Sequence, residues 1–220
     1  MVPDRKDERL RMVETQLRAR GLRDEKVLSA VARIPRHLFV PDDMAALAYA
    51  DEPLPIGRGQ TISQPYIVAY MTEALRLQGG EKVLEVGTGS GYQTAVLAET
   101  AGEIWTVELV EELSVRAKER LHALGYENIR FRVGDGSAGW PEAAPFDGIV
   151  VTAAPESVPT ALELQLAPGG RMVLPVGLGS QELVLIRREG DSFRRKGLIG
   201  VRFVPLVQRA ARGTGAEGED

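Results

Sequence analysis

The chain has 220 residues, of which 44% are hydrophobic, and a formal net charge of −4, which predicts one domain with a sizeable core and argues against a dedicated nucleic-acid binder. It contains no cysteine, which excludes disulfides and thiolate metal sites. His37 and His122 stand far apart in the sequence among residues that are not metal ligands, so we expect no metal site. Because no signal peptide opens the chain and no apolar run approaches the roughly 18 residues of a membrane span, we expect a cytoplasmic protein without a membrane partner.

Short helices are predicted for the N-terminal part of the chain. Apolar residues at helical spacing indicate a helix over 5–19 that ends at Gly21. Asp24 can cap a second helix, which Pro35 stops. A further short helix is expected over 42–48. These helices predict a helical cap on the main fold rather than an independent domain.

Residues 49–66 are rich in proline and glycine and predict a loop. This loop is long for a connector, and long loops in compact domains tend to carry function. It leads into a strongly patterned helix over 64–77, with Pro65 in the first turn. Ser63 stands just before this helix, and the alternative to a functional role is that it is only an N-cap.

From residue 82 onward, short apolar runs alternate with helical patterns, which predicts a parallel sheet flanked by helices. The expected strands cover residues 82–86, 103–109, 129–133, 146–153 and 172–176. The expected helices cover residues 94–99, 111–124 and 158–166, the last one stopped by Pro168, Gly169 and Gly170. Two β segments, 181–188 and 194–207, predict an antiparallel pair at the end of the sheet. The small, polar residues from 210 to 220 are expected to be disordered.

A glycine-rich turn follows the first strand, with Gly87, Gly89 and Gly91 at alternate positions. Glycine lets the backbone adopt positive φ and approach a ligand, and a helix N-terminus offers free N–H groups. A dinucleotide site would need glycine where Tyr92 stands, and the spacing instead resembles motif I of S-adenosylmethionine-dependent methyltransferases. Glu85 suits the ammonium group of that cofactor, directly or through water. The alternative is a strand-end charge paired with a neighbour.

Acidic residues follow the next two strands, at the carboxyl ends where open α/β sheets bind ligands. Glu108 lies about 20 residues beyond the glycine turn and can accept hydrogen bonds from both ribose hydroxyls. It could instead cap the following helix, although glutamate is a poor N-cap. Asp135, between Gly134 and Gly136, can accept from the exocyclic amine of adenine, the alternative being an ordinary Asp-Gly turn.

Four stretches together resemble one family, the protein-L-isoaspartate O-methyltransferases, over about residues 12–207. They are the loop from Pro55-Ile56-Gly57 to Thr61-Ile62-Ser63-Gln64-Pro65, motif I, Gly134-Asp135-Gly136, and Leu166-Ala167-Pro168-Gly169-Gly170-Arg171 leading to Leu174-Pro175-Val176-Gly177. The segment 61–65 is the most specific, since motif I marks many methyltransferases. Arg58 departs from the pattern, because bacterial members commonly have histidine there, and it could alter the substrate rim.

The resemblance implies an α/β fold of the Rossmann-like S-adenosylmethionine-dependent methyltransferase type: a mostly parallel twisted sheet with helices on both faces and an N-terminal helical cap. We expect a single domain over 1–209, with 1–62 as cap and substrate loop, 63–209 as cofactor-binding core, and 210–220 as a disordered tail. Ser63 is implied as the active-site serine. The predicted cofactor residues are Thr61, Ile62, Ser63, Glu85, Gly87, Thr88, Gly89, Glu108, Leu109, Asp135 and Gly136. The residues expected to wall the peptide site are Leu174, Pro175, Val176, Gly177, Val204, Pro205 and Leu206.

The implied reaction is methyl transfer from S-adenosylmethionine to the free carboxylate of L-isoaspartyl residues in damaged proteins and peptides, which starts repair through a succinimide. That carboxylate is ionised at neutral pH, with an ordinary pKa of about 3.9, so no general base is needed and the Ser63 hydroxyl would position the substrate. No G-x-S-x-G elbow surrounds Ser63, which disfavours a hydrolase. The open alternatives are a methyltransferase for a small molecule or another peptide carboxylate, an NAD-dependent oxidoreductase, and a non-catalytic adenosylmethionine-binding module.

Overall fold

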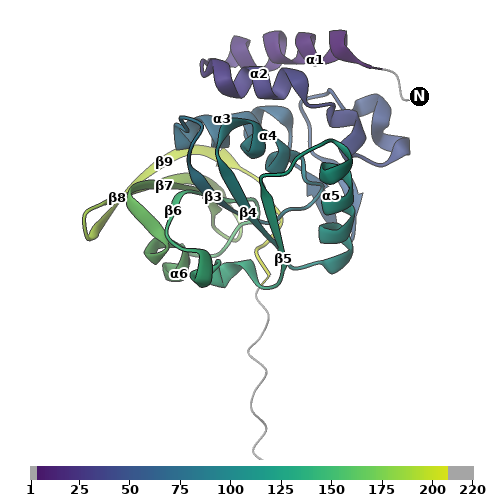
Figure 1. Cartoon of the computed structure of the whole chain (residues 1–220). Helices are drawn as coiled ribbons and strands as arrows, with labels where there is room; N and C mark the ends of the chain where they lie inside the picture. The colour runs from purple at the N-terminus through teal and green to yellow at the C-terminus, as the bar shows by residue number, and fades with distance from the viewer. Residues whose placement is uncertain (1–3, 208–220) are drawn as a thin grey trace, which may run out of the picture.

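A seven-stranded, mostly parallel sheet forms the centre of the computed structural model, which describes residues 4–207 (Figure 1). Its strands are β3 (Lys82–Val86), β4 (Glu103–Glu108), β5 (Ile129–Val133), β6 (Phe146–Val151), β7 (Leu166–Val176), β8 (Gln181–Glu189) and β9 (Ser192–Val201). The order is β5-β4-β3-β6-β7-β8-β9. Strand β8 runs antiparallel to both of its neighbours, β7 and β9. The predicted parallel sheet and its antiparallel end are therefore confirmed. The expected disordered tail, 210–220, lies outside the described residues.

Alternate residues of the central strands point to opposite faces of the sheet and build two apolar layers. Val83 and Val150 belong to the layer that also contains side chains of α3, α4 and α5, whereas Leu84 and Ile149 pack with Leu162 of α6. The helices are α3 (Pro65–Leu75), α4 (Tyr92–Thr100), α5 (Glu111–Ala123) and α6 (Thr160–Leu164). Helices cover both faces, as predicted, but the second face has only the short α6 and 3-10 turns.

Helical segments at the N-terminus lie over α3 and α4, at the top of Figure 1. The first begins as α1 (Lys6–Met12), continues through a π-helical turn and a 3-10 turn, and ends at Gly21, whose φ is 97°. The second is α2 (Glu25–Arg33), and the Asp24 carboxylate accepts hydrogen bonds from the first-turn N–H groups of Lys26 and Val27 at 2.9 and 3.3 Å. Both predicted helices and the Asp24 cap are confirmed.

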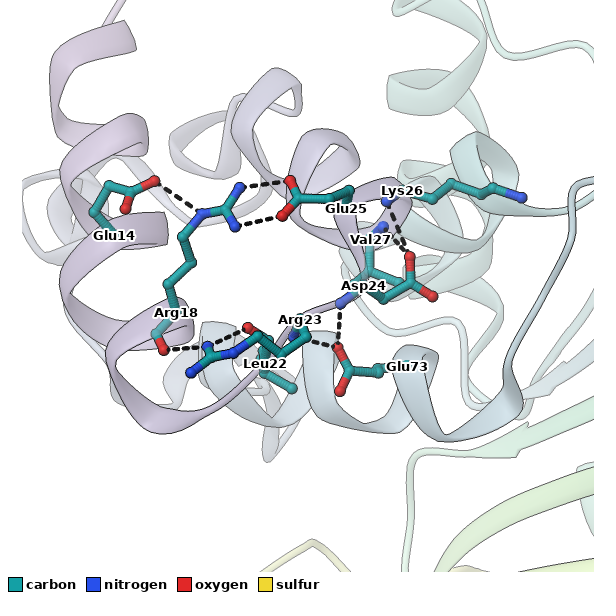
Figure 2. A network of polar contacts seen from close by, with 9 residues as sticks. All are labelled: Glu14, Arg18, Leu22, Arg23, Asp24, Glu25, Lys26, Val27 and Glu73. Atoms are coloured by element: carbon teal, nitrogen blue, oxygen red, sulfur yellow. Dashed lines mark hydrogen bonds and ion pairs between the residues drawn. The ribbon is translucent and has the colours of Figure 1, made fainter.

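Polar contacts hold the segments of this cap together and join them to α3, as Figure 2 shows. Glu73 of α3 accepts hydrogen bonds from the backbone N–H groups of Arg23 and Asp24 at 2.9 and 2.8 Å. The Arg18 guanidinium donates to both carboxylate oxygens of Glu25 at 2.5 and 2.6 Å, which joins the end of the first segment to the start of α2. The N-terminus of α2 is thus held from both sides.

The sequence predicted a loop over the whole segment 49–66, but part of this segment forms regular structure. Within it, β1 (Leu54–Gly57) and β2 (Gln60–Ile62) pair as an antiparallel hairpin. The hairpin forms because Gly57, Arg58 and Gly59 all adopt positive φ, at 90°, 55° and 70°, and reverse the chain. The Arg58 side chain is exposed and pairs with Glu112 of α5, outside the lining of the main cleft.

Two predicted boundaries near β7 are wrong. The helix expected over 158–166 is only five residues long, and β7 already begins at Leu166. Phe146 pairs with Leu166 and Gly148 pairs with Arg171, so the Pro-Gly-Gly segment is absorbed as a bulge in the strand instead of ending a helix. Among residues 4–207, no helix combines the length and the apolar character that crossing a bilayer requires.

Candidate functional site

A cleft of about 1040 Å³ opens at the carboxyl ends of β3, β4 and β6. The strand order reverses between β3 and β6, and open α/β sheets bind ligands at such points. The volume lies at the upper end of the about 300–1,000 Å³ that is typical of small-molecule sites. Segments far apart in the chain line it, including residues 60–64, the glycine turn and residues 199–207.

The glycine turn brings backbone directly to the cleft. Gly87 has a φ of 97°, and a Cβ atom there would lie 2.3 Å from Oγ1 of Thr152. The Thr152 hydroxyl donates a hydrogen bond to the Gly87 carbonyl at 2.7 Å, and the Gly87 N–H donates to Val107 at 2.8 Å. Only glycine fits this position, because both the conformation and the space exclude a side chain.

Glu108 lies at the end of β4 with its carboxylate in the cleft lining. One carboxylate oxygen accepts from the N–H of Gly89 and the other from the N–H of Val110, both at 2.9 Å. A carboxylate has about four lone-pair sites, so acceptor capacity remains toward the cleft. The bond to Val110 also serves the start of α5, so the ligand-binding and helix-start interpretations are compatible.

Ser63 lies between the end of β2 and the start of α3 and lines the cleft. The free N–H of Tyr66, in the first turn of α3, is bound by the carboxylate of Asp51 at 2.9 Å. The residue at the N-cap position is Gln64. The alternative that Ser63 serves only as an N-cap is therefore wrong. Within residues 4–207, the Ser63 hydroxyl has no hydrogen-bond partner, which leaves it available to a ligand.

Glu85 does not line the cleft, and a direct contact with a cofactor is not supported by this geometry. Its side chain is completely buried, and one carboxylate oxygen accepts hydrogen bonds from the hydroxyls of Thr94 and Thr106 at 2.6 Å. The Thr106 hydroxyl also contacts that of Thr88 at 2.6 Å, in the glycine turn. Burial, with a smaller contribution from Glu108, raises the pKa of Glu85 to about 8, against the two threonine hydrogen bonds. Glu85 therefore supports the glycine turn from its buried side, through Thr106 and Thr88.

We expect Glu85→Gln to raise the melting temperature of the cofactor-free protein at pH 8 and to change it little at pH 4.5. The folded-state pKa of about 8 exceeds the ordinary 4.5, so the stability from this group is complete below pH 4.5 and is lost as pH rises to about 8. Glutamine stays neutral and removes that loss, and each kcal/mol corresponds to about 2–4 °C. Calorimetry across this pH range is the measurement, with exposed Glu119→Gln as control. A pH-independent difference would contradict the assignment.

The structure brings most of the predicted cofactor residues together. Those in the cleft lining are Thr61, Ile62, Ser63, Gly87, Thr88, Gly89, Glu108, Leu109 and Gly136. Asp135 adjoins Gly136 but does not line the cleft, and one of its carboxylate oxygens accepts from the N–H of Ser137 at 2.9 Å. The turn interpretation of Asp135 therefore has direct support.

Three of the seven residues predicted to wall the peptide site line the cleft. Val204, Pro205 and Leu206 do so, but Leu174, Pro175, Val176 and Gly177 do not. The reason is that β7 extends to Val176, so Leu174 and Pro175 are buried within the sheet layers. The turn that follows, residues 178–181, reaches the cleft instead.

Backbone hydrogen bonds hold the 204–206 wall against the end of β6. The N–H of Ala154 donates to Val204, and the N–H of Leu206 donates to Ala154, both at 2.8 Å. The side-chain amide of Gln181 pairs with the backbone N–H and carbonyl of Phe203 at 2.6 and 3.0 Å. This wall is thus fixed to the strand end that carries Thr152.

Two residues that shape the site were missed in the sequence. Thr152 directly follows β6, and the rule that ligands bind beyond strand ends could have indicated it. Asp51 caps a helix 15 residues further along the chain, and no local pattern signals so distant a contact.

The family model described as Protein-L-isoaspartate(D-aspartate) O-methyltransferase (PCMT) matches residues 8–211. The chain belongs to this family. The protein-L-isoaspartate O-methyltransferase of Dictyoglomus thermophilum is 57% identical over 205 residues, which cover 93% of each chain. That of Anaeromyxobacter dehalogenans is 60% identical over 191 residues, covering 85% of this chain and 91% of the relative.

Solved structures of the family share the fold. One protein-L-isoaspartate O-methyltransferase matches with a TM-score of 0.80 at 29% identity, and the match covers 91% of this chain and 65% of that chain. A Plasmodium falciparum PCMT in complex with S-adenosyl-L-homocysteine also matches with a TM-score of 0.80, at 24% identity, covering 91% of this chain and 99% of that chain. The Rossmann-like methyltransferase fold expected from the resemblance is therefore confirmed.

Proposed function

We propose that this chain transfers the methyl group of S-adenosylmethionine to the free carboxylate of L-isoaspartyl residues in damaged proteins and peptides, which initiates repair through a succinimide. The observation that carries the proposal is the position of Ser63. It lies in the family's most specific segment and lines the same cleft as the glycine turn and Glu108. Its hydroxyl has no partner within residues 4–207.

The residues of the cleft fit this cofactor. Glu108 can accept hydrogen bonds from both ribose hydroxyls, and Gly87, where a Cβ would meet Thr152, allows a ligand to approach the backbone. Tyr92, 1% exposed, fills the third position of the dinucleotide fingerprint, which agrees with a cofactor that lacks a pyrophosphate. When bound, S-adenosylmethionine supplies a methyl group activated by a cationic sulfur. The other proposed contacts are Thr61, Ile62, Thr88, Gly89, Leu109, Asp135 and Gly136.

Several residues of the cleft lining suit an anionic peptide. The substrate carboxylate is ionised at neutral pH, with an ordinary pKa of about 3.9, so no residue has to remove a proton. The Ser63 hydroxyl donates a hydrogen bond that orients this carboxylate, and orientation with exclusion of water can supply roughly 7–11 kcal/mol. Arg202, an exposed cation of the lining, favours a negative substrate, and Val204 to Leu206 wall its peptide. The methyl ester then cyclises without the enzyme.

The proposal also covers organisation and partners. Residues 1–62 serve as cap and substrate loop and 63–209 as cofactor-binding core of one domain. The substrates are isoaspartyl proteins and peptides in the cytoplasm. The negative net charge supports a function without nucleic acid, and the lack of cysteine excludes thiolate metal ligands; the proposal includes neither a membrane nor a metal.

The test is methyl transfer from labelled S-adenosylmethionine to an isoaspartyl peptide and to its aspartyl twin. We expect transfer to the isoaspartyl peptide alone, because the nucleophile must sit beside Ser63. Titration calorimetry with S-adenosylmethionine and with NAD is run in parallel. Cofactor binding without transfer to either peptide would point to a different acceptor, and binding of NAD alone would contradict the proposed cofactor.

A further inference from the structure

Arg36 is the largest fully buried side chain of the described structure, at 0% exposure. Its guanidinium donates to three backbone carbonyls, those of Ala48, Glu52 and Ser63, the last two at 3.3 and 3.1 Å. Among residues 4–207 no carboxylate lies within ion-pair distance of it, and its Nε has no partner. Burial lowers the pKa of Arg36. A buried charge without a counter-ion is costly, and an apolar residue would fill such a space more cheaply.

The hydrogen bond to the Ser63 carbonyl connects the buried Arg36 charge to the segment that carries Ser63. The last pair of the β1–β2 hairpin joins Leu54 to Ile62, and the first helical hydrogen bonds of α3 are accepted by Gln64. Ser63 lies between these two ladders, so its carbonyl needs a partner from elsewhere. Arg36 supplies that partner, and a hydrogen bond from a charged donor is roughly twice as strong as a neutral one.

The chain is held again just beyond Ser63. Asp51 binds the N–H of Tyr66 at 2.9 Å and the side-chain amide of Gln64 at 3.2 Å. The Ser63 peptide is therefore fixed between a cation on its carbonyl side and an anion on its helix side. Neither Arg36 nor Asp51 lines the cleft, so both act from behind the segment.

Arg36 also approaches the helix that follows the glycine turn. Its guanidinium carbon lies 5.7 Å from the ring centre of Tyr92, the first residue of α4. Phe39, from the same short turn as Arg36, packs edge-on against that ring at 5.5 Å. One buried side chain thus contacts both the segment that carries Ser63 and the helix that follows the glycine turn.

We propose that Arg36 is a positioning residue that sets the Ser63 hydroxyl relative to the cofactor side of the cleft, through its hydrogen bond to the Ser63 carbonyl. The inference rests on the proposed role of Ser63 in orienting the substrate carboxylate. It assigns Arg36 no contact with substrate or cofactor. Loss of Arg36 should therefore slow the methyl-transfer step without weakening cofactor binding.

The test compares Arg36→Met and Arg36→Lys with Arg9→Met. Arg9 is a matched control, because it is also buried, at 6% exposure, and donates to the carbonyl of Ala32 and to Asp4 instead of to the Ser63 segment. We expect Arg36→Met to lower kcat by about 10- to 100-fold, the scale of misplacement near the chemistry, with KM for the peptide and Kd for S-adenosylmethionine nearly unchanged. Arg36→Lys keeps a charged donor and should recover part of kcat, and it replaces Arg36→Met if that variant does not fold.

Two further readouts separate positioning from general destabilisation. Amide hydrogen exchange over residues 62–66 should accelerate in Arg36→Met and not in Arg9→Met. In a Ser63→Ala background, Arg36→Met should have no further effect on kcat, because both changes remove one function. Additive losses, unchanged exchange at 62–66, or an equal kcat loss in Arg9→Met would overturn the inference. If the parent protein does not methylate isoaspartyl peptides but exchange at 62–66 still responds to Arg36, the proposed function fails while the anchoring of Ser63 stands.

Discussion

Ser63→Ala is expected to lower kcat/KM for an isoaspartyl peptide by about 10- to 1,000-fold, judged from the cost of misplacing groups near the chemistry. The hydroxyl lines the cleft and has no partner within residues 4–207, so its removal costs no hydrogen bond inside the protein. Stability should change little, because Asp51 and not Ser63 binds the free N–H of α3. The loss of about 1 kcal/mol that accompanies removal of a capping serine is therefore not expected.

The measurement is steady-state methyl transfer well below the melting temperature, together with thermal unfolding. Ser29→Ala, an exposed position of α2, controls for the loss of a hydroxyl. If Ser63→Ala methylates the isoaspartyl peptide at the parent rate, Ser63 is not the active-site serine. Earlier melting with unchanged turnover would restore a purely structural role.

Glu108→Ala is expected to weaken S-adenosylmethionine binding by about 1.5–3 kcal/mol, the scale of hydrogen bonds to a charged group. Two causes act together. The ribose hydroxyls lose their acceptor, and the N–H groups of Gly89 and Val110 lose the carboxylate that binds each of them at 2.9 Å. The second loss loosens the glycine turn itself, so the effect should lie toward the upper end of this range.

Titration calorimetry measures this change, with Glu111→Ala as the matched control. Glu111 is three residues further on, exposed at the start of α5 and outside the cleft lining, so the two variants share the change in net charge. Equal affinities for the parent and Glu108→Ala would remove Glu108 from the cofactor site. Equal losses in both variants would assign the effect to long-range charge instead of contact.

The central sheet was predictable because its strands are buried on both faces and therefore read as short apolar runs. The hairpin before α3 was not, because its turn places the non-glycine residue Arg58 at a φ of 55°, which side chains rarely adopt. The bulge in β7 was hidden for a related reason. A Pro-Gly-Gly segment normally ends an element, and only pairing with β6 shows that the strand continues through it.

The cleft was predictable where ligand contacts come from strand ends, as at Gly87 and Glu108. The direct cofactor contact predicted for Glu85 is not supported, because the alternation of β3 turns this side chain away from the cleft. It is two residues beyond Val83 and shares its face, which packs on the helices and not on the cleft. Arg36 and Asp51 left no local signal, since their contacts with the Ser63 segment span 27 and 15 residues respectively.

The wall at Val204 to Leu206 has a consequence for protein synthesis. It docks on Ala154 through backbone hydrogen bonds, so the cleft stays open on one side until residue 207 has left the ribosome. At about 5–20 residues per second, the glycine turn is made several seconds before this wall. We therefore expect the complete cleft to form only after the whole described fold has emerged.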